Sequence, residues 1–165
     1  MDRNLTTKDF LEELQGEDEL GAAIRAHLII ENYVDQMIQI MVPYPKELKS
    51  IRLDYGGKLS LVAALGVKAE VLKPLSVLGG IRNKFAHKPR YKLTHSEVKN
   101  LYKSFRERDQ DWVHKSYAEA AKSHDSLRNL SKYNDLPPKE QFIFMVITIR
   151  AIVIAVIEKL EERYA

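Results

Sequence analysis

Three side chains near the middle of the chain have the types and spacing needed for acid–base chemistry on a phosphodiester. Arg82, Asn83 and His87 lie within about one and a half turns of a predicted helix. His87 follows Asn83 by four residues, so these two side chains stack on one face, and the long Arg82 side chain can swing to the same rim. An imidazole can transfer protons near neutral pH, and an adjacent fixed cation suits a phosphate. The pattern therefore indicates a candidate catalytic site.

The local sequence also allows a purely structural role for these residues. Pro89 forces Lys88 out of the α region, so the helix is predicted to end near Ala86 or His87. Asparagine and histidine are ordinary residues at a helix C-terminus, where unpaired carbonyls and the helix dipole favour polar or cationic groups. In this interpretation Arg82 would be tied to a carboxylate on a neighbouring helix.

Positive charge is concentrated on and after this segment. The chain has a net charge of +3, but residues 81–108 contain nine lysines and arginines and only two glutamates. Such a patch favours a polyanion through phosphate contacts, although a solvated helix face has the same composition. The residues predicted to contact such a polyanion, RNA or DNA, are Lys84, Lys88, Arg90 and Lys92, with Tyr91 in a supporting role.

Composition indicates one globular domain over residues 1–165. Apolar residues make up 45% and charged residues 30% of the chain, which is long enough to bury a core. The absence of cysteine excludes disulfides and thiolate metal sites. Because the first fifteen or so residues are polar and acidic, with no apolar signal core, a cytoplasmic protein is predicted. No cofactor is expected.

Hydrophobic periodicity predicts an all-α bundle of about five to six helices and no strand. Residues 1–16 are expected to contain an N-terminal helix, and Tyr55-Gly56-Gly57 is expected to be a turn. Residues 109–136 are predicted to be an irregular insertion or loop. The other helices are predicted over 18–42, 58–65, a stretch that follows 67–72 and ends at the Arg82–His87 motif, 93–108, and 138–163. Thr94 and Glu97 form a capping box of the T-x-x-E type, which predicts the start of the helix over 93–108.

Two further features concern the second helix and the fourth. His27, Glu31 and Asp35 recur at four-residue steps and could be drawn as a metal site, but no further ligand cluster is nearby. We expect no metal, a packed or rim position for His27, and Glu31 as a supporting carboxylate that faces Arg82. The Gly79-Gly80 pair predicts close approach of another backbone, from the second helix or from a second subunit.

The last helix is apolar from Phe142 to Ile157 except for Thr148 and Arg150. This run is too short and too interrupted to predict a membrane span. A helix that is apolar nearly all round is buried on several sides, so it is expected at the bundle centre or in a subunit interface.

The motif from Arg82 to His87 resembles that of the HEPN superfamily of small helical bundles, in which an arginine and a polar residue precede a histidine by a few residues. The segments 59–67 and 81–87, followed by Leu93 and Thr94, resemble more narrowly the MltR-like branch, named for the mannitol operon repressor. The resemblance covers roughly Gly21 to Phe105. It implies metal-independent RNA cleavage at a composite homodimer site.

By this resemblance each motif residue has a role. His87 would move the proton between the 2′-OH and the leaving oxygen, Arg82 would stabilise charge on the phosphate, and Asn83 would orient it. Several toxin members of toxin–antitoxin systems carry a tyrosine two residues after the histidine, where this chain has Pro89, with Tyr91 two residues later.

The MltR-like branch is associated with transcription regulation, yet the sequence has no helix-turn-helix signal. Repression would therefore act through a regulatory protein partner. A non-catalytic regulator or protein-interaction module is thus the alternative to a ribonuclease.

Overall fold

A computed structural model describes residues 5–88, 90–123 and 132–165 of the chain. Its described residues form helices and no strand, in agreement with the predicted all-α class. They contain seven α-helices and two short 3₁₀ helices, compared with the predicted five to six helices. The elements are α1 (Thr7–Gly16), α2 (Glu19–Met41), η1 (Pro45–Ile51), α3 (Tyr55–Ala64), α4 (Ala69–His87), α5 (His95–Ser104), α6 (Glu107–Ser123), η2 (Tyr133–Asp135) and α8 (Pro138–Tyr164).

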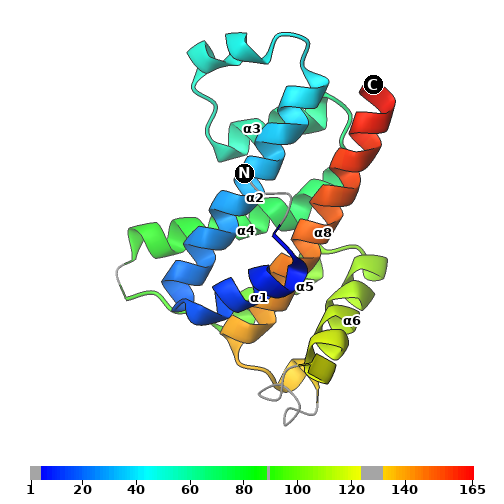
Figure 1. Cartoon of the computed structure of the whole chain (residues 1–165). Helices are drawn as coiled ribbons and strands as arrows, with labels where there is room; N and C mark the ends of the chain where they lie inside the picture. Colours follow the sequence, from blue (N-terminus) through cyan, green and yellow to red (C-terminus); the bar gives the residue numbers. More distant parts are fainter. Residues whose placement is uncertain (1–4, 89, 124–131) are drawn as a thin grey trace.

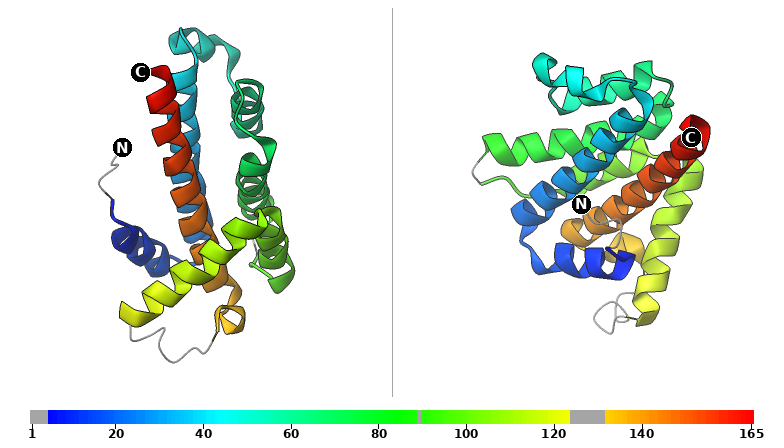
Figure 2. Two further views of the ribbon diagram at one scale, coloured as in Figure 1. Left: turned by 90° about the vertical axis from the view of Figure 1, so that its right-hand side faces the viewer. Right: turned by 45° about the horizontal axis from the view of Figure 1, so that its top comes forward.

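The two longest helices, α2 and α8, lie side by side at the centre (Figures 1 and 2). Every residue of α8 from Gln141 to Arg150 is buried, because α1, α2, α5 and α6 all pack on this half. The apolar run in the last helix is therefore explained by burial within one chain, and a subunit interface is not needed to account for it. Within the described ranges, no helix combines the length and apolar character needed to cross a membrane.

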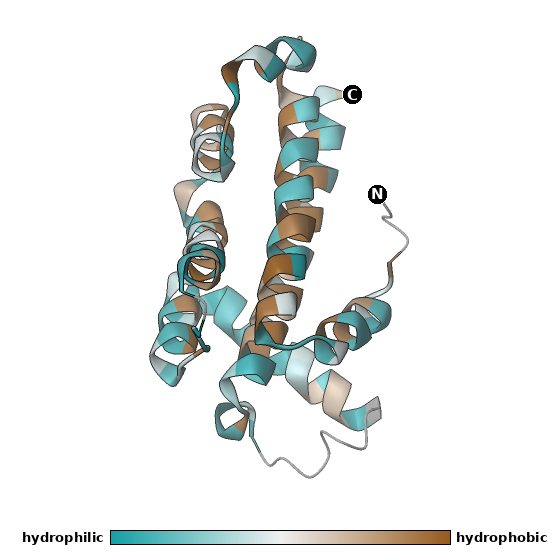
Figure 3. Cartoon of the chain, turned by 90° about the vertical axis from the view of Figure 1, so that its left-hand side faces the viewer, coloured by the Kyte–Doolittle hydropathy of each residue, from teal (hydrophilic) through white to brown (hydrophobic). Residues whose placement is uncertain are grey.

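Helices α3 and α4 pack on α2 and form a second layer. In Figure 1, α4 crosses behind α2, and its C-terminal end projects beyond α2 on the left. Seen from that side, apolar and hydrophilic residues alternate along the central column (Figure 3), as expected of helices that bury one face and expose the other. The projecting end of α4 carries the Arg82–His87 motif.

Short-range capping signals set several helix starts. The predicted capping box of Thr94 and Glu97 begins α5, and Thr6 caps α1 in the same way. Asp54 caps α3 by accepting a hydrogen bond from the Gly57 N–H at 2.7 Å. The predicted turn at Tyr55-Gly56-Gly57 is therefore wrong: these residues form the first turn of α3.

The segment after the motif also differs from the prediction. The helix predicted over 93–108 is broken, because Phe105 is extended between α5 and α6. Residues 107–123, most of which were assigned to an irregular insertion, form the regular helix α6. Its buried residues Asp109, Val113 and Tyr117 recur at four-residue steps and face the core, and α6 packs on α8. Residues 124–131 of the predicted insertion lie outside the described residues.

Candidate functional site

The C-terminal turns of α4 hold the motif at the surface by an apolar anchor. Ile81 and Phe85 are 3% and 7% exposed, so they fix this end of the helix in the core. Arg82 is half-buried, and Asn83 and His87 are exposed. The helix ends at His87 and Lys88 is extended, which confirms the prediction from Pro89.

The side chain of Arg82 reaches toward the exposed rim. Its Nη1 donates a hydrogen bond to Oδ1 of Asn83 at 3.1 Å, which confirms that the guanidinium swings toward that neighbour. Among the described side chains, Arg82 forms no ion pair with a carboxylate. The interpretation of Arg82 as one half of a structural ion pair therefore has no support within residues 5–88, 90–123 and 132–165.

His87 points away from Arg82 around the helix. His87 is five positions after Arg82, which corresponds to a rotation of about 140° and a rise of about 7.5 Å along the helix. Asn83 lies between them, since it contacts Arg82 and stands one turn before His87 on the same face. One chain therefore presents a guanidinium and an imidazole at the same helix end without converging them on one point.

Glu31 does not take the predicted place opposite Arg82. Its Oε1 lies 2.9 Å from Nζ of Lys58 on α3, and Asp35 lies 2.9 Å from the same ammonium. Burial opposes the charge on Lys58, but the hydrogen bonds and charges of Glu31 and Asp35 outweigh it and raise the pKa of the ammonium. The His27–Glu31–Asp35 ladder is thus organised around a lysine. In the part of the chain that the structure describes, no three acidic, histidine or cysteine side chains are grouped to hold a metal ion.

His27 is packed between three helices, as the prediction of a packed or rim position allowed. It is 5% exposed, its ring centroid lies 4.4 Å from that of Tyr55, and its Nδ1 lies 3.7 Å from Oε2 of Glu31. Burial lowers the pKa of His27; Glu31 partly offsets this effect, and the positive charges of Arg82 and Lys58 add to it. His27 is therefore neutral near pH 7, and Arg82 lies close enough to act on it.

Gly79 explains how these helices come so close together. A Cβ at this position would lie 2.8 Å from two ring atoms of Tyr55 and 3.9 Å from Nε2 of His27. A close approach does occur at Gly79, but side chains of α2 and α3 make it, so the prediction of another backbone at this position is wrong. Gly80 faces open space, because a Cβ at that position would have no atom within 4 Å.

The basic segment after α4 is attached to the bundle at several points. Nζ of Lys84 lies 2.9 Å from Oε1 of Glu97, so this predicted RNA ligand is already ion-paired. The ring of Tyr91 packs edge-on against Phe85 with centroids 4.6 Å apart, and the Leu93 N–H donates to Glu19 at 2.8 Å. These contacts fix both ends of the segment.

Three predicted RNA ligands remain exposed beside the motif. Lys88, Arg90 and Lys92 form no ion pair with any described carboxylate, and with His87 they line a shallow, open depression. The surface thus offers several uncompensated cations within reach of the imidazole. Tyr91 also lines the depression, although its hydroxyl is buried without a hydrogen-bond partner among the described residues.

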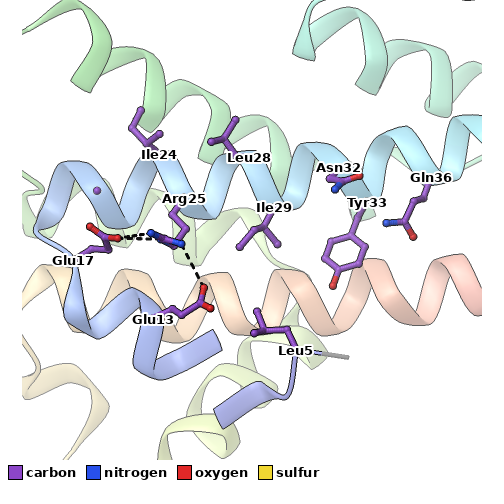
Figure 4. Close-up of a pocket in the computed structure, with 11 residues that line it drawn as sticks. Leu5, Glu13, Glu17, Ile24, Arg25, Leu28, Ile29, Asn32, Tyr33 and Gln36 are labelled. Atoms are coloured by element: carbon purple, nitrogen blue, oxygen red, sulfur yellow. Dashed lines mark hydrogen bonds and ion pairs between the residues drawn. The ribbon is translucent and has the colours of Figure 1, made fainter. Parts of the chain in front are cut away.

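A second concavity lies between α1 and α2 (Figure 4). It has a volume of about 710 Å³ and a largely apolar lining that includes Leu28, Ile29 and Tyr33. Its cation, Arg25, is held 2.6 Å from Oε1 of Glu17 and 3.6 Å from Oε2 of Glu13. Because its charged side chains satisfy one another, this pocket is a weaker candidate for chemistry on an anion than the end of α4.

Sequence reasoning missed Tyr55 and Lys58, which place His27 and Glu31. Both belong to α3, and Tyr55 is held by a hydrogen bond from its hydroxyl to the carbonyl of Leu75 at 3.0 Å. The one available signal was the glycine at position 79 inside a helix, which predicted close packing without identifying the partner.

Comparison with protein families, with curated proteins and with solved structures finds no match for this chain.

Proposed function

We propose that this chain binds RNA at the C-terminal end of α4 and cleaves it without a metal ion, as a HEPN-like homodimer of the MltR-like kind that acts in the cytoplasm. One observation carries the proposal: the Arg82 guanidinium, with no carboxylate partner in the described residues, shares a helix end with the exposed imidazole of His87. A fixed cation and a proton-transfer group at one exposed edge are what phosphodiester chemistry requires.

In the proposed reaction the ribose supplies the nucleophile. His87 accepts the proton of the 2′-OH as the 2′-oxygen attacks phosphorus, and the bond from phosphorus to the 5′-oxygen breaks. The proton then passes to the leaving 5′-oxygen, which yields a 2′,3′-cyclic phosphate and a free 5′-OH. Arg82 neutralises charge that develops on the phosphate, and Asn83 orients the guanidinium through their hydrogen bond.

The directions of the two groups support the proposed homodimer. Because Arg82 and His87 lie about 140° apart around α4, a second chain that brings its own motif opposite would place groups on both sides of one phosphate. Leu20 and Leu28 on α2 are 46% and 56% exposed, and with Ile24 they recur at four-residue steps. Such an exposed apolar strip on a neighbouring helix is a suitable contact for a second copy.

A cleavage assay with matched histidine variants tests the chemistry. Wild-type protein is expected to cut single-stranded RNA in EDTA and to leave cyclic phosphate ends. His87→Ala should abolish cutting, whereas His95→Ala, which removes an exposed histidine at the start of α5, should not. If wild type and His87→Ala leave several RNA substrates equally intact, the catalytic proposal is wrong.

Salt dependence separates binding from cleavage. If Lys88, Arg90 and Lys92 contact phosphates, each alanine variant should weaken RNA binding and reduce the slope of log affinity against log salt by about 0.7. Lys84→Ala should change the slope less, because Lys84 is already paired with Glu97.

A non-catalytic regulator is the second candidate, and the divergence of Arg82 and His87 favours it if the chain acts as a monomer. This candidate predicts a stable complex with another protein that survives His87→Ala, and no RNA cleavage at any salt concentration. Measuring mass in solution together with the EDTA assay distinguishes the two candidates, since the composite site requires a dimer.

A further inference from the structure

A groove runs along the C-terminal half of α8. In Figure 1 this half of α8 lies on the right, whereas the C-terminal end of α4, which carries the motif, lies on the left. Its volume is about 680 Å³. The floor is formed by α8 residues at steps of three and four: Ala151, Ile152, Ala155, Val156 and Leu160. The facing walls come from the start of α4 and from α6.

Trp112 stands at one edge of this groove and is 59% exposed. It also borders a second groove of about 400 Å³ between α1 and α6, where α8 contributes Phe144 and Ile147. The α8 residues of this second groove are buried, with Phe144 1% and Ile147 5% exposed, and Trp112 and Ser116 of α6 line both grooves, so α6 separates them. Only the groove along the C-terminal half of α8 therefore has an open floor, and from Ala151 to Leu160 this floor is about 14 Å long, which matches two to three turns of a guest helix.

The rim of the groove along α8 is positively charged. Lys68, Arg108 and Lys159 are exposed, and neither Lys68 nor Lys159 forms an ion pair with a described carboxylate. The one carboxylate in the lining, Asp109, is 5% exposed and is held by Arg106 through hydrogen bonds of 2.5 and 3.1 Å. The exposed rim is therefore cationic around an apolar floor.

We propose that this face of α8 is a docking site for an acidic amphipathic helix of a partner protein. An apolar trough two to three helical turns long selects a guest with apolar side chains at three- and four-residue steps. The cationic rim selects glutamate or aspartate on the flanks of that guest and disfavours lysine. A nucleic acid would match the rim but not the apolar floor, so a peptide is the favoured occupant.

The chain supplies its own reporter for this site, because Trp112 is the only tryptophan in the sequence. The probe is a tryptophan-free synthetic peptide of about 18 residues, or roughly five helical turns, with leucine at every third or fourth position and glutamate at most others. Its addition should shift the Trp112 emission to shorter wavelength in a saturable way, and added salt should weaken the binding. A matched peptide with lysine in place of glutamate should bind at least about tenfold more weakly.

Three variants locate the binding. Ala155→Glu places a negative charge on the exposed floor, and Lys68→Glu reverses one rim charge; each should weaken the glutamate peptide about tenfold. Lys99→Glu, an exposed charge reversal on α5 outside the groove, should leave the affinity unchanged. Lys68→Glu and Lys99→Glu change the net charge by the same amount, so a difference between their peptide affinities cannot come from net charge alone. If Ala155→Glu does not fold, Lys68→Glu still tests the site.

Several outcomes would overturn the proposal. They are an unchanged Trp112 emission with the glutamate peptide, equal affinity for the lysine peptide, equal weakening by Lys68→Glu and Lys99→Glu, or an emission shift produced instead by a single-stranded RNA oligonucleotide. None of these measurements depends on RNA cleavage, so the docking site and the proposed ribonuclease activity are tested independently.

Discussion

Neighbouring glycines in α4 should respond to alanine in opposite directions. At Gly80 a methyl group meets no atom within 4 Å, so Gly80→Ala gains only helix propensity, about 1 kcal/mol of stability. At Gly79 the same methyl group lies 2.8 Å from Cδ1 and Cε1 of Tyr55. Ordinary carbon–carbon contacts begin at about 3.5 Å, so the Tyr55 ring would have to move by about 0.7 Å or more.

The Tyr55 ring has little room for such a movement. It packs on the ring of His27 at 4.4 Å, and its hydroxyl donates to the Leu75 carbonyl at 3.0 Å. Overpacking in a core costs about 1–3 kcal/mol, which exceeds the gain of about 1 kcal/mol in helix propensity. We expect Gly79→Ala to lower the free energy of unfolding by about 1 kcal/mol, so the two variants should differ by about 2 kcal/mol.

Thermal unfolding followed by circular dichroism measures this difference. For a chain of 165 residues, about 2 kcal/mol corresponds to roughly 4–8 °C in Tm. Urea titration of both variants and of wild type gives the free energies independently. If Gly79→Ala is as stable as Gly80→Ala, the Tyr55 ring does not restrict this position and the described packing of α2, α3 and α4 is wrong.

Three further changes test the surrounding contacts. Because the pKa of His27 is lowered in the folded protein, protons bind preferentially to the unfolded chain. The free energy of unfolding should therefore keep its full value above about pH 6.5 and should decrease as the pH falls below that value. Urea titrations between about pH 6.5 and 5 should show that His27→Gln removes this decrease. An identical slope in the variant would refute the assignment. Lys58→Met leaves the half-exposed carboxylates of Glu31 and Asp35 without their cation and should cost about 1 kcal/mol, measured by urea titration; no loss would show that the pair contributes nothing. Tyr91→Phe removes a buried hydroxyl with no partner in the described residues, so stability should be unchanged or raised by up to about 1 kcal/mol; a clear loss in Tm would mean that the hydroxyl is bonded.

Helix ends that are set by a few neighbouring residues were predicted correctly. The end of α4 follows from Pro89, and the start of α5 follows from the Thr94–Glu97 pair, because each signal acts within four residues. The exposed position of His87 follows from the same reasoning, since it occupies the last turn of a projecting helix. Local chemistry was sufficient for these elements.

Features that depend on distant residues were missed. Glu31 binds Lys58 rather than Arg82, and the choice between two cations on different helices depends on how α3 and α4 sit on α2. Helix α6 was obscured because its buried stripe includes Asp109, a carboxylate that is buried only because Arg106 neutralises it. Hydrophobic periodicity does not register a charged residue as part of a core face.

The central pairing of α2 with α8 joins segments from opposite ends of the chain. During synthesis, α2 emerges long before Pro138 is added, so the part of its apolar surface that packs on α8 has no native cover while α3 to α6 are being made. Closing so long an interval carries an entropic cost before any contact between the two helices is gained. A nascent chain that stops after α6 should therefore be recognised by chaperones and degraded. Stable folding should start only after α8 has left the ribosome.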